Sequence, residues 1–195
     1  QGNILIDTPP ELRLQLLRPV PGTALFRRMS APQLEEPPDV SAVARVPSTL
    51  ADWRWGILNV GARLVDKRLD AGSYAVLAST MLREGLLPLV TYGPSERALA
   101  EQVVALTPEA RLAPPTTVAE LAWLMKAARC VVSCDTGPMH LAVALGVPTF
   151  GIFVSTDPAR YGHTFAPHRA LDARRTELGS LRAEVARWLA RLPPS

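Results

Sequence analysis

The chain has 195 residues, which allows one sizeable domain but is too short for two full α/β domains. Hydrophobic residues make up 48% and charged residues 20%, which excludes global disorder, a collagen-like repeat and a disulfide-rich scaffold and predicts a soluble globular protein. The formal net charge is only +3, and its excess lies in residues 169–195, which hold six arginines and three acidic residues. We interpret this Arg-rich end as a solvated helix face rather than a surface for anionic membranes or nucleic acid, because no nucleic-acid motif accompanies it.

The first 56 residues differ in composition from the rest. Residues 3–7 suggest a short strand, but six prolines follow between residues 19 and 47, a density that prevents long helices and central strands. We therefore predict a Pro-rich N-terminal arm over residues 1–56 and an α/β domain over residues 57–195.

From residue 57 onward, short apolar runs alternate with helical patterns, which predicts βα units around a parallel sheet. Gly85 and Gly146 follow apolar-periodic segments where a helix C-terminus favours a residue that tolerates positive φ. Thr117 and Glu120 form a capping box at another helix start. We expect strands over residues 57–60, 86–92, 130–134 and 148–154, helices over residues 74–82, 95–106, 117–125, 138–145 and 176–192, and a loop over residues 155–169.

Two of these helices and the two cysteines carry expectations about packing. Ser95 is predicted to cap the second helix, with Leu99, Val103 and Leu106 facing inward. The last helix must bury one apolar stripe, formed by Leu178, Leu181, Val185, Trp188, Leu189 and Leu192. Cys130 and Cys134 lie roughly 13 Å apart along a predicted strand, so we expect buried packing residues rather than a disulfide or a shared metal site. Such cysteines suit a reducing compartment.

The most informative segment is Cys-Asp-Thr-Gly-Pro-Met-His, ending at His140, because it leaves the carboxyl end of a strand and enters a helix. Ligands of open α/β sheets bind at this edge. Gly137 allows close backbone approach, Pro138 at the first helical position sacrifices no needed amide donor, and the helix dipole attracts a phosphate. On these residues alone a second interpretation stays open, in which Asp135 or Thr136 only caps the helix and His140 is a satisfied buried histidine.

The same segment carries a family resemblance. Asp135-Thr136-Gly137-Pro138-Met139-His140-Leu141-Ala142, continued by residues 144–149 and 156–158, resembles the signature of glycosyltransferase family 9, the lipopolysaccharide heptosyltransferases. Val60-Gly61-Ala62 with Lys67-Arg68, Gly93-Pro94-Ser95-Glu96 and residues 116–121 extend the resemblance, which covers about residues 57–165. It implies a Rossmann-like parallel sheet with flanking helices, resembling the C-terminal half of a GT-B glycosyltransferase, which holds a nucleotide-sugar donor that is usually ADP-heptose.

The resemblance also implies roles for individual residues. Lys67 would stabilise the diphosphate leaving group, a role that protein cations and oriented donors must fill where no metal does so. Glu96 would face the nucleoside. The remaining donor-binding residues implied by the family are Gly61, Ala62, Thr116, Asp135, Thr136, Gly137, Pro138, Met139 and His140. Two alternatives stay open, since Lys67 could be a surface charge and Glu96 a first-turn acid that complements its own helix dipole.

The function implied is transfer, with inversion, of a sugar from a nucleoside diphosphate to a lipopolysaccharide or glycan acceptor. The resemblance further implies a cytoplasmic protein at the inner membrane surface that needs no metal or other cofactor and binds no nucleic acid. Family members carry an N-terminal domain that binds the acceptor and supplies a general base in a Gly-Asp motif, which this sequence lacks. Residues 1–56 would then be a remnant of that domain, with Asp7 as a displaced base.

A second polypeptide or a second copy would otherwise complete the site, and the apolar stripe of the last helix would be available to dock it. Two alternative hypotheses are a non-catalytic nucleotide-sugar-binding or structural module, and a remnant of a longer enzyme that serves no reaction. The sequence contains no Gly-x-Gly-x-x-Gly, Walker or Gly-x-Ser-x-Gly motif, which argues against dinucleotide oxidoreductases, P-loop NTPases and α/β-hydrolases. It does not identify the sugar, the base of the donor or the acceptor.

Overall fold

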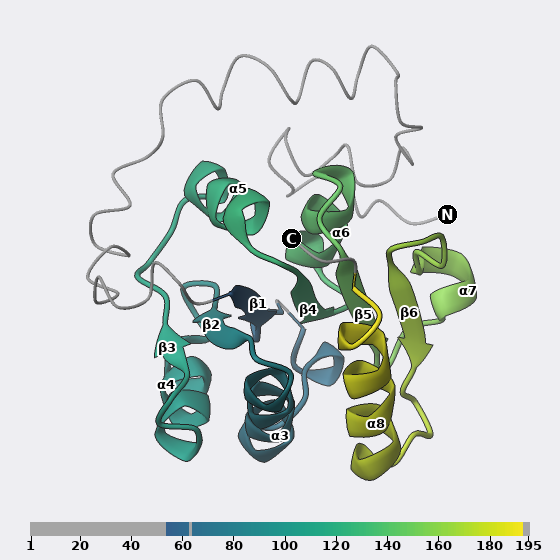
Figure 1. Cartoon of the computed structure of the whole chain (residues 1–195), viewed down its shortest axis with the longest axis horizontal. Helices are drawn as coiled ribbons and strands as arrows, with labels where there is room; N and C mark the ends of the chain where they lie inside the picture. Colours follow the sequence, from purple (N-terminus) through teal and green to yellow (C-terminus); the bar gives the residue numbers. More distant parts are fainter. Residues whose placement is uncertain (1–53, 63, 193–195) are drawn as a thin grey trace.

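The computed structural model describes residues 54–62 and 64–192, which form a six-stranded parallel sheet between two layers of helices (Figure 1). The strands are β1 (Trp55–Asn59), β2 (Leu87–Thr91), β3 (Arg111–Leu112), β4 (Val131–Cys134), β5 (Thr149–Phe153) and β6 (Arg169–Asp172). The helices are η4 (Val65–Lys67), α3 (Ala71–Arg83), α4 (Arg97–Leu106), α5 (Val118–Ala127), α6 (Gly137–Ala144), α7 (Pro158–Tyr161) and α8 (Leu178–Leu189). The predicted α/β class with a Rossmann-like parallel sheet is therefore confirmed.

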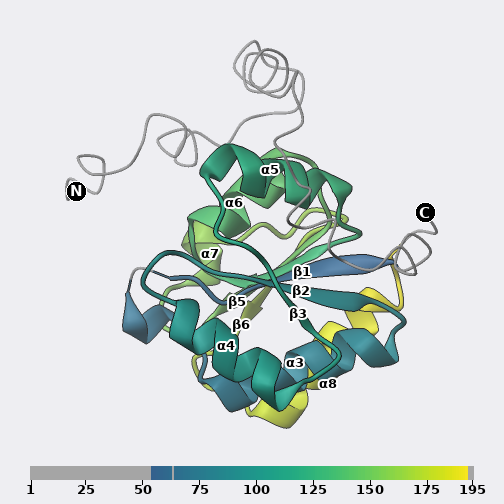
Figure 2. The ribbon, with the colours of Figure 1, turned by 90° about the vertical axis from the view of Figure 1, so that its left-hand side faces the viewer.

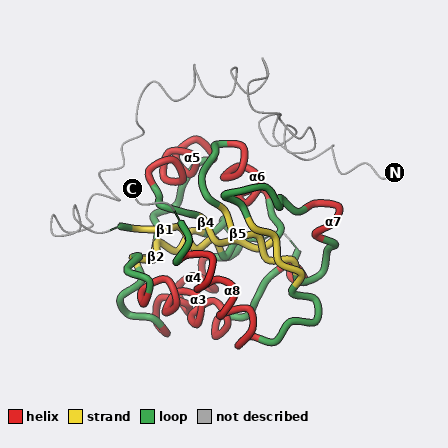
Figure 3. Tube along the Cα trace, turned by 45° about the vertical axis from the view of Figure 1, so that its right-hand side comes forward, coloured by secondary structure: helices red, strands yellow, loops and turns green. Residues whose placement is uncertain are grey.

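Helices cover both faces of the sheet, and successive side chains of each strand point to opposite faces, so each strand contributes to both hydrophobic cores. Leu58, Val132 and Phe150 belong to the hydrophobic core on the side of α3, α4 and α8. Ile57 and Val131, one residue away in their strands, belong to the core on the side of α5 and α6. Figures 2 and 3 show these helix layers on either side of the sheet.

The strand order β3-β2-β1-β4-β5-β6 creates one special position in the sheet. From β1 the chain winds outward through β2 to β3, and α5 then carries it back to β4 on the other side of β1. Connections from β1 and β4 therefore leave the sheet in opposite directions. This topological switch point is where open α/β sheets bind their ligands, at the carboxyl ends of the strands.

The four predicted strands and five predicted helices are all present, and the ends of α3, α5 and α6 follow the expected local chemistry. Thr117 and Glu120 form both hydrogen bonds of the capping box at α5. Gly85 and Gly146 adopt φ of +74° and +75° after α3 and α6, a conformation that other residues rarely accept. Pro88 lies within β2. It is tolerated because its nitrogen faces β3, whose pairing with β2 begins only at Leu89.

Four elements escaped the sequence-based prediction, the first of which is the three-residue helix η4. β3 has only two residues, too few for any alternation of apolar and polar side chains to register. The segment expected to be a loop over residues 155–169 contains the four-residue helix α7 and leads directly into β6. β6 is the outer strand beside β5 and is partly exposed, so its sequence lacks the apolar run of a central strand.

The expected capping and packing of α4 are wrong at two positions. The chain makes one further turn, in which the Glu96 amide donates to the Gly93 carbonyl, so α4 begins at Arg97 and Ser95 lies one residue too early to cap it. The Ser95 hydroxyl instead donates to the Glu96 carboxylate. Leu106, expected to face inward, is 59% exposed, because the helix ends there and its buried stripe is supplied by Ala100 and Val103.

The apolar stripe of α8 packs within the domain and is not available to dock a partner. Leu181, Val185 and Leu189 are buried in the same core as α3 and the sheet. The Trp188 ring contacts Phe150 of β5 edge to face, with the ring centroids 5.4 Å apart. Both cysteines are buried and unpaired, as predicted. Within the described residues, no helix is long and apolar enough to cross a membrane.

Candidate functional site

Asp135 is the centre of a polar cluster at the carboxyl edge of the sheet. It follows β4 directly and its side chain is only 6% exposed. Oδ2 accepts hydrogen bonds from Lys67 Nζ at 2.9 Å and from Thr156 Oγ1 at 2.6 Å, while Oδ1 lies 3.2 Å from His140 Nε2. Three side chains, from η4, from the first turn of α6 and from the segment after β5, thus meet at a single carboxylate at the end of β4.

The Asp135 carboxylate is ionised because its partners outweigh its burial. Burial by itself raises the pKa of the group, but hydrogen bonds from His140, Thr156 and Lys67, together with the Lys67 charge, hold that pKa well below its usual range. Lys67 is 26% exposed on its side chain, so its ammonium group reaches both the carboxylate and solvent. The cluster therefore keeps a cation at the sheet edge with a fixed anchor and with N–H donors beyond the one that Asp135 uses.

A second histidine joins the cluster through His140. Nδ1 of His140 lies 2.9 Å from Nε2 of His163, and the two rings meet edge to face with centroids 5.1 Å apart. His163 lies two residues beyond the end of α7, so it reaches the site from a segment far along the chain. Asp135, His140 and His163 form a continuous chain of hydrogen bonds.

Beneath this cluster, buried polar side chains connect β1, β2 and β4. Asn59, the last residue of β1, donates from Nδ2 to Ser133 Oγ at 3.0 Å and to the Gly61 carbonyl at 3.1 Å. Its Oδ1 accepts from Thr91 Oγ1 of β2 at 3.3 Å. Ser133 Oγ in turn lies 3.2 Å from Thr136 Oγ1. These bonds tie the strand ends together and hold Thr136 at the start of α6, so the floor of the site is satisfied and rigid.

Close backbone contacts bring the loops after β1 and β2 together on the other side of the switch point. A side-chain Cβ at Gly61 would lie 2.9 Å from the Gly93 backbone nitrogen, and one at Gly93 would collide with the Glu96 carboxylate. Glu96 is buried, and its Oε1 lies 3.8 Å from Arg68 Nη1. Because Arg68 follows η4, this pair places the Glu96 side chain on the same side of the sheet edge as Lys67.

Comparison with known proteins places this geometry in a family. The family model described as glycosyltransferase family 9 (heptosyltransferase) matches residues 35–184, more than half of the chain.

The chain belongs to glycosyltransferase family 9.

One curated protein and two solved structures are similar to this family 9 chain. It is 33% identical over 103 residues to lipopolysaccharide heptosyltransferase 1 of Pseudomonas aeruginosa, a match that covers 52% of this chain and 29% of the relative. Its fold is similar to that of the E. coli heptosyltransferase WaaC with ADP, with a TM-score of 0.64, 21% identity, and coverage of 77% of this chain and 47% of that one. It also resembles E. coli ADP-heptose LPS heptosyltransferase II, with a TM-score of 0.62, 20% identity, and coverage of 72% and 48%. The chain spans less than half the length of these relatives.

The structure brings some of the residues singled out from the sequence into one cluster and leaves others at its margin. Lys67, Asp135 and His140 are in direct contact. Thr136 follows Asp135 in the chain and contacts Ser133 of the floor, and Met139 is buried, with its sulfur 2.6 Å from where a Cβ at Gly151 would lie. The positions at the margin or in the adjoining loops are Gly61 and Ala62 after β1, Glu96 before α4, Thr116 before α5, and Gly137 and Pro138 in the first turn of α6. Asp7 lies outside the described residues.

The helix-capping interpretation of this segment does not account for all the contacts that form, although both ring nitrogens of His140 have partners as it expects. Thr136 is the N-cap residue of α6, but its side chain makes no capping hydrogen bond. Asp135 uses its carboxylate to bind Lys67, Thr156 and His140. Lys67 is an ion-paired residue rather than an isolated surface charge, and Glu96 is turned toward Arg68 rather than aligned as a first-turn acid.

Sequence reasoning missed Asn59, Ser133 and His163 as members of this polar cluster and its floor. Asn59 and Ser133 are polar residues within otherwise apolar strands, a pattern that can be read from the sequence alone. His163 lies in a segment with no periodic pattern, and only the path of the chain after α7 brings it to His140. Among the described residues, no group of three or more His, Cys, Asp or Glu side chains is arranged to hold a metal ion.

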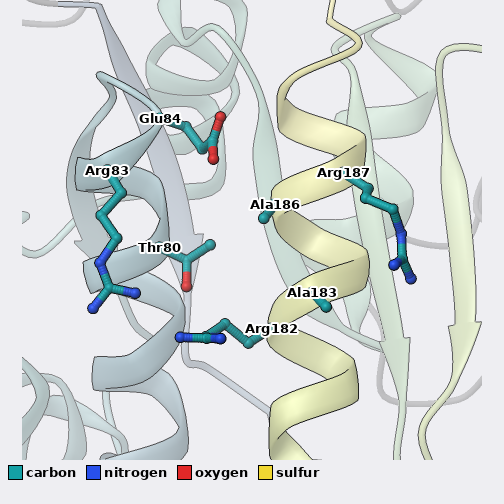
Figure 4. Close-up of a pocket in the computed structure, with 7 residues that line it drawn as sticks. All are labelled: Thr80, Arg83, Glu84, Arg182, Ala183, Ala186 and Arg187. Carbon is teal, nitrogen blue, oxygen red and sulfur yellow. The ribbon is translucent and has the colours of Figure 1, made fainter.

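A shallow groove of about 340 Å³ lies elsewhere, between α3 and α8 (Figure 4). Arg182 extends from α8 toward Thr80 of α3, and Arg187 points away from α3. The residues that line it lie toward the C-terminus of α3, which precedes β2, so the groove is nearer the amino edge of the sheet. The hydrogen-bonded carboxyl-edge cluster is the better candidate site, because the groove lacks converging buried polar groups.

Proposed function

We propose that this chain holds the donor of a heptosyltransferase-type reaction, a nucleoside-diphosphate sugar resembling ADP-heptose, at the carboxyl edge of its sheet. The single observation that carries the proposal is the cluster of Lys67, Thr156 and His140 around the ionised Asp135, at the switch point of a family 9 domain. Two solved relatives are described with ADP and with ADP-2-deoxy-2-fluoro heptose, which supports an adenosine diphosphate donor.

The chemistry of the cluster suits a diphosphate leaving group. In inverting transfer, an acceptor oxygen attacks the anomeric carbon, the bond from that carbon to the diphosphate oxygen breaks, and the diphosphate leaves with the electron pair. Lys67 would neutralise the growing negative charge, while Asp135 keeps the ammonium group in place. The N-terminal end of α6 would add its dipole, and Glu96 would face the ribose of the nucleoside.

The acceptor in this proposal is a lipopolysaccharide precursor or another glycan, met at the cytoplasmic surface of the inner membrane. The acceptor-binding surface and the general base would come from an acceptor domain, a second polypeptide or a second copy of the chain. Donor binding can therefore be tested separately from sugar transfer, and it is the first experiment.

Thermal unfolding of the full chain with ADP, UDP or ADP-heptose tests the donor site. Ligand at about 100 times its dissociation constant adds roughly 2.7 kcal/mol of stability, or several degrees for a chain of this size. We expect a larger shift with ADP-heptose than with UDP, and a loss of that shift in Asp135→Ala and His140→Ala. Unchanged ADP-heptose affinity in both variants would contradict the site assignment.

A second candidate function is nucleotide-sugar binding without turnover, as a sensor or a structural module. It is supported by the same cluster, because the charges and hydrogen bonds around Asp135 would hold a nucleotide sugar whether or not the sugar is transferred. Both candidates require donor binding. Only the transferase predicts that sugar leaves ADP-heptose when an acceptor domain and acceptor are added, as measured by release of ADP.

A further inference from the structure

We propose that His163 is a positioning residue of the donor site, which holds the His140 imidazole and, through it, the Asp135 carboxylate in the orientation that anchors Lys67. This inference rests on the proposed function, because the orientation affects a reaction only if the cluster receives a nucleotide sugar.

The direction of the hydrogen bonds follows from the Asp135 carboxylate. An ionised carboxylate can only accept, so Nε2 of His140, 3.2 Å from Asp135 Oδ1, carries a hydrogen. In neutral His140 the other nitrogen, Nδ1, then has a lone pair, and Nε2 of His163 donates to it across 2.9 Å. If His140 gains a proton, the same two atoms bond in the opposite sense.

In either case one hydrogen lies between the two rings, and both nitrogens of His140 are engaged. A histidine held at only one nitrogen can turn about χ2 or tilt without breaking its single bond. His163 removes that freedom, as outer-shell partners do for the histidine ligands of metal sites. Asp135 in turn presents Oδ1 to His140 and Oδ2 to Lys67 and Thr156, so a rotation at His140 would disturb the anchor of Lys67.

The chain around His163 is built to deliver this side chain to α6. Gly162 packs so closely that a Cβ there would lie 2.5 Å from the Pro158 carbonyl oxygen and 2.7 Å from Ala170 Cβ. On its far side the His163 ring meets Phe165 edge to face, with centroids 6.0 Å apart. The rings of Phe165 and the buried His168 meet edge to face, with centroids 4.8 Å apart. The Phe165 carbonyl also accepts a hydrogen bond from the His168 amide at 2.8 Å. These contacts hold the His163 ring in a defined position beside His140.

Three variants of the full chain test the role, namely His163→Ala, His163→Gln and, as a control in the same exposed segment, Thr164→Ala. The dissociation constants of ADP and ADP-heptose are measured by titration calorimetry. In ligand-free protein labelled with ¹⁵N, scalar coupling between His140 Nδ1 and His163 Nε2 reports the shared hydrogen directly. We expect this coupling in the wild type and in Thr164→Ala.

Loss of one hydrogen bond should weaken donor binding about fivefold in His163→Ala. The glutamine amide nitrogen takes nearly the place of imidazole Nε2, so His163→Gln should bind within about twofold of the wild type, and Thr164→Ala should be unchanged. A residue that only packs in its loop would not be rescued by glutamine.

Donor affinity in His163→Ala equal to or tighter than in the wild type would overturn the proposal, as would absence of the coupling or failure of glutamine to restore binding. Failure of the wild type to bind either nucleotide would instead overturn the proposed function, and the donor-site role of His163 with it. The two failures are distinguishable, because the coupling is measured without any nucleotide.

Discussion

Charged side chains gather in two regions of this molecule, and they are held in different ways. At the carboxyl edge of the sheet, Asp135 is almost buried and three side chains from separate elements donate to it. In the groove between α3 and α8, Arg83, Arg182 and Arg187 are exposed, and the Arg187 pair with Glu184 lies within one helix. Burial and the number of partners, rather than the number of charges, therefore decide where a charged side chain affects stability and function.

The largest expected effect on stability is that of Asp135→Ala. Removing the carboxylate leaves Lys67, Thr156 and His140 without their common acceptor, and we expect a loss of about 3 kcal/mol in the free energy of unfolding. Urea denaturation followed by circular dichroism measures it. Asp135→Asn, which keeps the size and one acceptor oxygen, should lose less. A loss in Asp135→Ala no greater than in a groove variant would contradict the distinction between the two regions.

The chain has only two lysines, which provides a matched pair for nucleotide binding. Lys67 is anchored at the cluster, whereas Lys126 is exposed in the last turn of α5. If the proposed donor site is correct, Lys67→Ala should weaken ADP binding by roughly tenfold, equivalent to about 1.4 kcal/mol, and Lys126→Ala should have no effect. Titration calorimetry of the two variants distinguishes a site-specific cation from a general effect of net charge.

The buried carboxylate of Asp135 should contribute more than an exposed carboxylate to the loss of folding stability at low pH. The pKa of Asp135 in the folded chain lies below its usual 3.8, so the unfolded chain takes up the proton first as the pH falls. The stability that Asp135 contributes is therefore present above about pH 4 and is lost progressively at lower pH. Unfolding free energies of the wild type and Asp135→Asn, measured from pH 6 down to about pH 2, should converge in acid.

Asp172 provides the control for this titration. Hydrogen bonds from Arg174 lower its pKa to about 2, but the pair is exposed to solvent and therefore screened. Asp172→Asn should leave most of the acid sensitivity of the wild type in place. An equal effect of the two Asn variants on the pH dependence of the unfolding free energy would contradict a larger contribution from the buried carboxylate.

The smallest effects are expected in the groove. Arg182→Ala and Arg187→Ala should each change the free energy of unfolding by less than about 0.5 kcal/mol, because exposed ion pairs contribute little. Neither should alter ADP affinity, since the groove lies nearer the opposite edge of the sheet. Chemical denaturation and calorimetry measure both, and reduced ADP affinity in either variant would point to a nucleotide site outside the carboxyl-edge cluster.

Much of the fold was predictable because its signals are local. The capping box at Thr117, the glycines after α3 and α6, and the apolar runs of β1, β2, β4 and β5 each depend on neighbours within a few residues. β3 and β6 were missed because a two-residue strand and a partly exposed outer strand lack such patterns. Leu106 shows the same limit, since only the end of α4 decides that it faces solvent.

The sequence by itself determined the α/β class, the family resemblance and the residues of the Asp-Thr-Gly-Pro-Met-His turn at the carboxyl end of β4, because these are properties of short contiguous segments. The tertiary structure alone decided that Lys67, Thr156 and His140 share the Asp135 carboxylate, that Asn59 and Ser133 form the floor, and that His163 reaches His140. The physical reason is distance along the chain. Contacts between residues up to 74 positions apart depend on strand order and loop path, which no local pattern encodes.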